Sequence, residues 1–253
     1  MYAEERQQLI VDRARSVGRV DGAELAAELE VTAETIRRDL SILERHGLLR
    51  RVHGGAIPVE RLGFEPGLAT RDAVMTTEKD QIAKAALAEL PDEGSILLDA
   101  GSTTARLAEM LPLDRQLTVL TNALPVALSL ATRANVTVLL VGGRVRGRTL
   151  AAVDLWALDA LGQSYVDVAF LATNGVSIER GLTTPDQAEA AVKKAMIRSA
   201  RRVVLLADHT KVSSDHLARF GELSEIDTIV TDLGLDEQIA AEIESHGPRV
   251  VRA

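Results

Sequence analysis

Polar residues suited to binding an anion stand between an expected strand and an expected helix, in the segment Asp99-Ala100-Gly101-Ser102-Thr103-Thr104. Gly101 permits a close approach of the backbone. Ser102, Thr103 and Thr104 place hydroxyls at a helix N-terminus, where free N–H groups and the helix dipole attract phosphate. An ordinary Ser/Thr N-cap would give the same pattern. The segment lacks the Gly-Lys-Ser/Thr of a Walker loop, and it is not a dinucleotide-binding fingerprint.

Four later loops carry glycines, amides, hydroxyls and basic groups at the ends of expected strands: Thr121-Asn122, Gly142-Gly143-Arg144, Thr173-Asn174-Gly175 and Asp208-His209-Thr210-Lys211. Asp99 and Asp208 can accept protons from sugar hydroxyls, while Lys211 or Arg144 can neutralise a phosphate. These loops favour a small polyhydroxylated anion as the ligand. The residues expected to contact it are Asp99, Gly101, Ser102, Thr103, Thr104, Asn122, Gly142, Gly143, Arg144, Asn174, Asp208 and Lys211.

Two further groups of charged residues have a simpler interpretation. His209 and His216 each follow an Asp, but their spacing matches no usual set of metal ligands, so we expect no metal and no cofactor. Glu189 and Lys193 stand four residues apart in an expected helix. This spacing predicts an exposed ion pair that contributes about 0.3–0.5 kcal/mol.

The elements that must position the strand-end residues alternate along the second part of the chain. Short apolar runs predict strands, and amphipathic stretches between them predict helices, so the pattern indicates a mainly parallel sheet covered on both faces. Such a sheet binds ligands beyond the carboxyl ends of its strands. The expected strands are 95–98, 117–120, 136–141, 168–172, 203–206, 228–230 and 249–251. The expected helices are 78–90, 103–111, 125–131, 188–200 and 236–246.

The first 57 residues have a different pattern, with three helices followed by two short strands. Helices are expected over 6–16 and 23–29, and a third begins after the N-cap Thr32 and stops at Gly47. Apolar positions on the third helix mark one buried face. Short β-prone runs on either side of Gly54-Gly55 predict a two-stranded wing.

Basic residues concentrate on the third helix and the wing. From Arg37 to Arg51 the chain has five Arg and two acids. A helix enters the major groove with its N-terminal side chains at the base edges, while flanking Arg residues hold phosphates. The pattern therefore predicts a winged helix-turn-helix on duplex DNA, in preference to a small helical domain with solvated Arg residues. Between the two parts, residues 58–76 contain Pro58, Gly63, Pro66 and Gly67 and predict a linker without sustained periodicity.

Composition limits the remaining possibilities. The 253 residues contain no Cys, which excludes disulfides and a cysteine nucleophile, and only 2% are aromatic, which disfavours stacking on single-stranded nucleic acid. The net charge of -8 divides into -1 for residues 1–57 and -7 for the remainder, so DNA contact requires a local basic patch. No apolar stretch reaches the roughly 18 residues of a membrane span. The polar start is no secretory signal, and we expect a cytoplasmic protein.

About twenty residues of the N-terminal part resemble the signature of the DeoR family of bacterial transcriptional regulators. They are Thr35-Ile36-Arg37-Arg38-Asp39-Leu40, Leu43-Glu44, Gly47 and Arg51-Val52-His53-Gly54-Gly55-Ala56. The resemblance implies that Arg37 and Arg38 clamp DNA while Thr32 and Thr35 approach the groove; Ser41 and Arg51 complete the expected surface. His53 is expected either to contact DNA or to be satisfied by backbone. Asp39 is expected to pair with a neighbouring Arg.

The second part resembles the effector half of the same family, an α/β fold similar to the sugar-phosphate isomerase and CoA-transferase type. This implies a winged helix-turn-helix at 1–57, a linker at 58–76 and an effector domain at 77–253. Glu65 and Arg71 match charged positions of the family, and Glu189 matches an acid near its ligand pocket. Asp154 follows Val153 where the resemblance implies glycine.

By this resemblance the chain is a repressor of sugar catabolism that works as a homodimer or homotetramer and is relieved by a phosphorylated sugar. The run 181–191 is similar to regulators of fructose utilisation, which makes fructose 1-phosphate the first candidate. Two alternatives stay open at this point. One is a sugar-phosphate isomerase-like enzyme with a DNA-binding appendage, and the other is an architectural DNA binder with an inert body.

Overall fold

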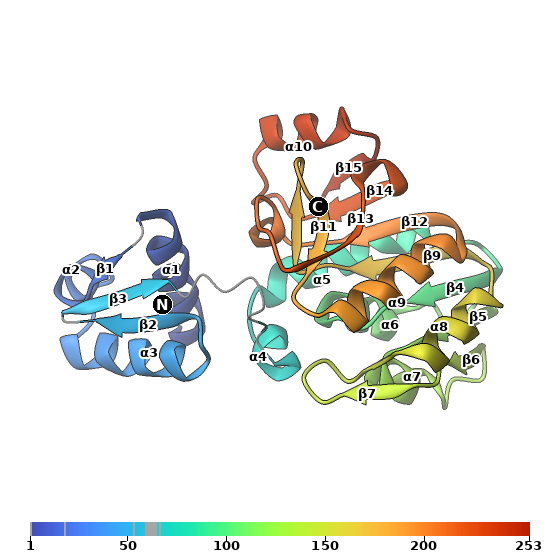
Figure 1. The fold of residues 1–253 in the computed structure, drawn as a ribbon, viewed down its shortest axis with the longest axis horizontal. Coiled ribbons are helices and arrows are strands. Elements are labelled where there is room, and N and C mark those ends of the chain that lie inside the picture. The colour runs from blue at the N-terminus through green and yellow to red at the C-terminus, as the bar shows by residue number, and fades with distance from the viewer. Residues whose placement is uncertain (1, 18, 53, 59–64, 66) are drawn as a thin grey trace. The chain divides into compact units, whose positions relative to one another are not determined.

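The computed structural model describes residues 2–17, 19–52, 54–58, 65 and 67–253 (Figure 1). The chain divides into two units, Met1–Val74 and Met75–Ala253, and each is described by itself. His53, one of the residues expected at the DNA surface, lies outside the described residues.

The first unit has the expected order of three helices and a wing. Asp21 and Thr32 cap the second and third helices, because their side-chain oxygens accept hydrogen bonds from N–H groups of the first turn. A two-residue strand that the sequence did not predict joins the wing and makes a sheet of order β1-β3-β2. The elements are α1 (Ala3–Val17), β1 (Val20–Asp21), α2 (Gly22–Glu28), α3 (Ala33–Arg45), β2 (Leu49–Val52) and β3 (Gly55–Pro58).

The segment after the wing differs from the structureless linker that its composition predicts. It contains the five-residue helix α4 (Leu68–Asp72). Glu65, which matches a charged position of the family, is buried, and its carboxylate forms an ion pair with Arg71 at 4.0 Å.

The second unit is built on a parallel sheet of seven strands, and every expected strand of the α/β part is one of them. The order across the sheet is β15-β14-β12-β9-β4-β5-β6. The chain therefore runs outward from β4 in one direction and then returns to place β9 on the other side of β4 (Figure 1). The strands are β4 (Gly94–Leu98), β5 (Leu117–Thr121), β6 (Val136–Leu140), β9 (Val166–Ala172), β12 (Ala200–Leu206), β14 (Thr228–Thr231) and β15 (Arg249–Arg252).

Helices cover both faces of this sheet, as the continuous apolar strands predict. Adjacent strand residues point to opposite faces, so Leu97 packs into one core cluster and Leu98 into the other. One face carries α5 (Thr76–Ala86), the short helix η1 (Leu87–Glu89), α6 (Ser102–Met110) and α7 (Leu124–Leu130). The other carries α8 (Leu155–Gly162), α9 (Gln187–Arg198) and α10 (Glu237–Glu244).

Short antiparallel elements extend the unit beyond what the sequence predicts. One is a hairpin of β7 (Arg144–Arg146) and β8 (Ala151–Val153). Another is a three-stranded sheet of β10 (Gly175–Ser177), β11 (Gly181–Thr184) and β13 (Ala218–Gly221). Two single turns, η2 (His209–Lys211) and η3 (Leu223–Glu225), complete the unit. The strands of the hairpin and of the three-stranded sheet have three or four residues each, which is too few for a period-2 pattern to be recognised in the sequence.

Asp154 occupies a backbone conformation that normally requires glycine. Its φ of 75° and ψ of -165° lie in a region that is almost confined to glycine. The residue directly follows β8 and pairs with Arg144 of β7 at 2.6 Å across the end of the hairpin. The departure from glycine noted in the sequence therefore falls on a strained position.

This strain can be measured by comparing two substitutions that both remove the Asp154–Arg144 pair. Glycine relaxes the backbone whereas alanine retains its strain, so we expect Asp154→Gly to be more stable than Asp154→Ala by about 1–2 kcal/mol. Urea unfolding followed by far-ultraviolet circular dichroism measures the difference. Equal stability of the two variants would show that the backbone at this position is not strained.

Candidate functional site

The first two turns of α3, the third helix of the first unit, carry exposed polar and basic side chains. Thr32 Oγ1 accepts a hydrogen bond from Thr35 N at 3.2 Å, and the two hydroxyls lie 2.9 Å apart. Arg37 and Arg38 are both exposed, while Ile36 is buried in the core of the unit. Arg37 pairs with Glu34 one turn earlier at 3.0 Å. The helix therefore carries two exposed guanidinium groups within its first two turns.

Ser41 and Arg51 lie together where the third helix meets the wing. Ser41 Oγ donates to Arg37 O, and Arg51 Nη1 donates to Ser41 Oγ at 3.1 Å. The backbone N–H of Arg51 also donates to Glu44. These bonds hold the wing strand β2 beside α3, so Arg51 belongs to the same basic surface as Arg37. The sequence-predicted residues of this surface, apart from His53, are therefore close neighbours along α3 and β2.

Asp39 has a different partner from the neighbouring Arg expected from the sequence. It is buried and accepts a hydrogen bond from Arg6 Nε of α1 at 2.6 Å and one from Gln7 at 2.8 Å. The pairing fixes α3 against α1 and turns the Asp39 side chain away from solvent. The local expectation was wrong because Asp39 faces the core and Arg37 and Arg38 face outward.

In the second unit, the loops after β4 and β9 meet at the point where the strand order reverses. Asp99, the first residue after β4, is buried and accepts hydrogen bonds from Ala172 N and from Lys193 of α9. Lys193 Nζ also donates to Ala172 O at 2.8 Å and lies 5.6 Å from the centroid of Phe220. Open α/β sheets bind ligands outside the carboxyl strand ends at such a reversal.

Burial raises the pKa of Asp99, while the Lys193 ammonium and the Ala172 N–H act in the opposite direction. Lys193 was not among the residues predicted from the sequence. Its i, i+4 spacing to Glu189 suggested a pair on the helix surface, whereas both residues are buried and each pairs elsewhere. That expectation was wrong because the helix face carrying them is turned toward the sheet.

The first turn of α6 follows Asp99 and leaves two hydroxyls open. A Cβ at Gly101 would lie 2.7 Å from the Cβ of Ala172, so only glycine lets the two loops approach this closely. Thr104 Oγ1 donates to Asp99 O at 2.7 Å and holds the loop. Within the described part of the chain, the hydroxyls of Ser102 and Thr103 have no hydrogen-bond partner and no side chain caps α6.

The amide side chains at neighbouring strand ends already have hydrogen-bond partners, backbone groups for Asn122 and the Thr184 hydroxyl for Asn174. Asn122 is buried; its Oδ1 accepts from Ala100 N and its Nδ2 donates to Ala152 O. Asn174 accepts from Thr184 Oγ1 at 2.9 Å. Asn122 therefore connects the Asp99 loop to the β7–β8 hairpin, and Asn174 lies at the end of β9 beside β11.

The arginine that reaches the cluster from the hairpin is Arg146. It contacts Glu189 and lies 3.3 Å from Asp186, the N-cap of α9. Glu189 is buried and also accepts a hydrogen bond from Thr149. Arg144, expected from the sequence, is exposed and pairs with Asp154. Arg146 stands two residues later on the same strand, a spacing that could have indicated it.

The two glycines before Arg144 form the turn between the edge strand β6 and the β7–β8 hairpin. Gly143 has a φ of 136°, and a Cβ there would lie 2.4 Å from Val153 O. Gly142 is exposed and has open space around it. These two residues lead from β6 into the hairpin, and within the described part of the chain no hydrogen bond joins them to Asp99 or Lys193.

Asp208 and Lys211 follow β12, the neighbour of β9. Asp208 is buried, accepts from Thr210 and lies 3.9 Å from Lys211. Burial acts to raise the pKa of Asp208, but Lys211, Thr210 and the buried Lys79 outweigh it and hold the pKa below its usual range. Lys79 extends the cluster from α5 and was missed because a lysine in a helix usually indicates a solvated face.

The two histidines considered as metal ligands have other partners. His209 Nδ1 lies 2.7 Å from Asp232, whose pKa is lowered because hydrogen bonds and the charge of His209 outweigh its burial. His216 Nε2 lies 3.2 Å from Asn174 O. Residues 2–17, 19–52, 54–58, 65 and 67–253 contain no group of three His, Cys, Asp or Glu side chains that could hold a metal ion.

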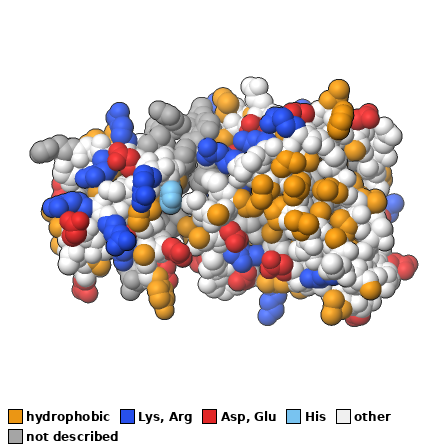
Figure 2. All heavy atoms as spheres, turned by 90° about the horizontal axis from the view of Figure 1, so that it is seen from below, with side chains coloured by type: hydrophobic (Ala, Val, Ile, Leu, Met, Phe, Trp, Pro, Cys, Tyr) orange, Lys and Arg blue, Asp and Glu red, His pale blue; other side chains and the backbone are white. Residues whose placement is uncertain are grey.

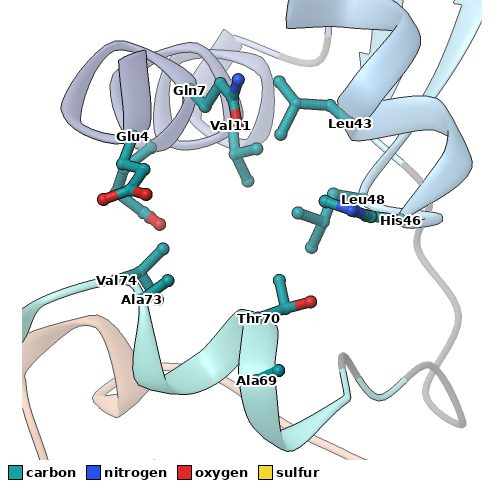
Figure 3. A pocket seen from close by; sticks show the side chains of 11 residues that line it. Glu4, Gln7, Val11, Leu43, His46, Leu48, Ala69, Thr70, Ala73 and Val74 are labelled. Atoms are coloured by element: carbon teal, nitrogen blue, oxygen red, sulfur yellow. The ribbon is translucent and has the colours of Figure 1, made fainter. Parts of the chain in front are cut away.

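Two cavities of about 300 Å³ lie away from these clusters. One is in the first unit, between α1, the end of α3 and α4, and its lining includes Glu4 and His46 (Figure 3). The other, beside α10, has Glu179, Asp215 and Glu242 in its lining. Neither lining contains Lys or Arg, so neither offers an anion the counter-charge that Lys193, Lys211 and Lys79 supply at the strand ends.

None of the described helices is both long enough and apolar enough to cross a membrane.

Comparison with known proteins identifies the same two parts. Residues 6–61 match the family model of the DeoR-like helix-turn-helix domain, and residues 74–233 match that of the DeoR C-terminal sensor domain. Among solved structures, ribose 5-phosphate isomerase A from Methanocaldococcus jannaschii is 18% identical, covers 53% of each chain and has a TM-score of 0.39.

Curated relatives match along nearly the whole chain. The "HTH-type transcriptional regulator GlpR" of Haloferax volcanii is 37% identical over 251 residues, which is 99% of this chain and 98% of the relative. The "Uncharacterized HTH-type transcriptional regulator FruR" of Bacillus subtilis is 35% identical, and the "Glycerol-3-phosphate regulon repressor" of Escherichia coli is 30% identical; each match covers 92% of both chains. The chain belongs to the DeoR family of helix-turn-helix transcriptional regulators.

Proposed function

We propose that this chain is a cytoplasmic repressor of a sugar-catabolism operon and releases its operator when a phosphorylated sugar binds the second unit. In this proposal residues 1–57 bind DNA, residues 77–253 bind the effector and residues 58–76 connect them. The observation that carries it is the combination of Lys193 and the open hydroxyls of α6 at the reversal of strand order with Lys211 after the next strand, β12.

The proposed effector site contains donors for the phosphate group of a sugar phosphate and acceptors for its sugar hydroxyls. The uncapped first turn of α6, with the Ser102 and Thr103 hydroxyls, offers N–H and O–H donors to a phosphate. Lys211 supplies a cation at the same edge of the sheet, after β12, which is two strands away from β4. Asp99 and Asp208 supply acceptors for sugar hydroxyls. Fructose 1-phosphate remains the first candidate, and glycerol 3-phosphate joins it through the name of the Escherichia coli relative.

An isomerase reading receives less support from the same residues. A general base must be free to reach a substrate carbon. Asp99 is bound by Lys193, Glu189 by Arg146 and Thr149, and Asp208 by Thr210. The carboxylates of the cluster are thus held in ion pairs or hydrogen bonds. Such fixed groups favour ligand binding over the abstraction of a proton from a substrate carbon.

Loss of one guanidinium from α3 tests the DNA surface. We expect Arg38→Ala to weaken binding to a duplex selected from a random library and to reduce the slope of log K against log salt by about 0.9 if Arg38 neutralises one phosphate. Fluorescence anisotropy at several salt concentrations measures both. Arg201→Ala, which removes an exposed arginine of β12, is the matched control and should change neither. Unchanged affinity and slope in Arg38→Ala would remove this residue from the interface.

A thermal-shift screen with fructose 1-phosphate, glycerol 3-phosphate and inorganic phosphate tests the effector site. A ligand at one hundred times its Kd stabilises by about 2.7 kcal/mol. That stabilisation raises the Tm of a domain of this size by about 5–10 °C. Ser102→Asp should abolish the shift, because its carboxylate would occupy the N-terminus of α6 and repel phosphate.

Ser224→Asp introduces the same charge in η3, at the amino-terminal edge of the sheet, and should retain the shift. Lys211→Ala serves as a second site variant if Ser102→Asp unfolds.

The stabilising phosphosugar should also lower the affinity of the wild type for its selected duplex about 100-fold, a coupling of about 2.7 kcal/mol. The effector proposal is wrong if no phosphosugar stabilises the wild type.

A further inference from the structure

The carboxyl end of the edge strand β6 is exposed on both faces of the seven-stranded sheet. Leu139 is 50% exposed and Leu140 is 52% exposed. As adjacent strand residues they point to opposite faces, so neither face has a covering element at this end of the strand. The strands of a parallel sheet are normally covered on both faces.

The two edges of the sheet differ in their protection against pairing with another chain. The edge strand β15 has the sequence Arg249-Val250-Val251-Arg252, and both arginines pair with acids of the same unit. Strand β6 and its flanks, residues 134–143, contain no charged residue and no Pro. Exposed edges in monomeric proteins usually carry such residues to prevent association. The β6 edge therefore has the composition of a surface that is paired in the working protein.

Neighbouring elements enlarge the bare edge into a continuous apolar surface. Figure 2 shows apolar side chains gathered over the end of the second unit that carries β6, α7 and the β7–β8 hairpin. The large apolar residues at this end are between 38% and 76% exposed: Leu128, Leu139, Leu140, Val145, Leu150, Leu155 and Trp156. Together they expose on the order of 800 Å², the area that each partner contributes to a standard protein–protein interface. We call these seven residues the β6 surface.

We propose that the β6 surface binds the β6 surface of a second copy of this chain about a two-fold axis. A two-fold contact places the same patch on both partners, so the patch must be self-complementary, as an uncharged apolar surface is. An axis perpendicular to β6 sets the two β6 strands antiparallel, which allows their unpaired N–H and C=O groups to bond across the interface. At its border Arg144 and Asp154 already neutralise each other.

The β7–β8 hairpin belongs to both the β6 surface and the effector cluster. Val145 and Leu150 contribute to the surface, while Arg146 and Thr149 of the same hairpin contact Glu189. A ligand that rearranges the contacts of Glu189 therefore acts on two residues of the interface through one short element. This link, unlike the self-association itself, rests on the proposed function.

Trp156 makes the self-association directly measurable, because it is the only tryptophan of the chain and is 76% exposed in the isolated protomer. We expect the full-length protein, without phosphosugar or DNA, to sediment as a dimer or larger even-numbered oligomer at micromolar concentration. Its tryptophan emission should be blue-shifted and protected from acrylamide, and dilution should shift the emission to the red as the interface separates.

Leu139→Lys and Leu140→Glu, one on each face of β6, should each weaken the association at least about thirtyfold, because each places a charge at the centre of the interface. Leu233→Lys, an exposed leucine after β14, is the matched control and should associate like the wild type. Circular dichroism identifies any variant that fails to fold.

A monomeric wild type with fully solvated tryptophan overturns the proposal, as does association that is unchanged in both folded β6 variants. These measurements contain no effector or duplex, so their failure leaves the proposed function standing. Conversely, a phosphosugar screen without a hit leaves the self-association result intact.

Discussion

The buried ion pair between Asp99 and Lys193 is the interaction that joins the strand ends at the centre of the second unit's sheet. It joins the loop after β4 to helix α9, and the second hydrogen bond of Lys193, to Ala172 O, adds the end of β9. Removing two charges from water costs more than their attraction returns unless further hydrogen bonds satisfy them. The pair is therefore stable only while β4, β9 and α9 keep these positions. Its presence requires that the three elements are correctly packed.

Helix α9 extends the influence of this pair to the edge of the sheet. Glu189, one turn before Lys193, contacts Arg146 of the hairpin, and the hairpin continues into the loop that leaves β6. A chain of direct contacts thus runs from the centre of the sheet to its bare edge. Since packed elements shift between discrete arrangements, such a chain is a physical route by which an anion could alter an interface.

In the first unit, too, a buried ion pair fixes the position of a helix. Asp39 lies on α3 between residues that face solvent, and its pairing with Arg6 anchors that helix to α1. Ser41 and Arg51 then tie the helix to the wing. In both units a buried acid fixes one helix, and the residues available for binding lie on the part of the structure that this helix positions.

Local patterns in the sequence determined the three N-terminal helices, the wing and the seven strands of the main sheet, but not helix α8 or the short antiparallel strands. Seven apolar runs became the seven strands, Thr32 capped α3, and polar loops followed the strands at one edge, because side-chain periodicity and capping act over a few residues. Tertiary structure alone decided the partners: Asp39 with Arg6, Lys193 with Asp99 and Arg146 with Glu189. These pairs join residues 33 to 94 positions apart, and which charges meet depends on how the helices pack, a property that no local pattern contains.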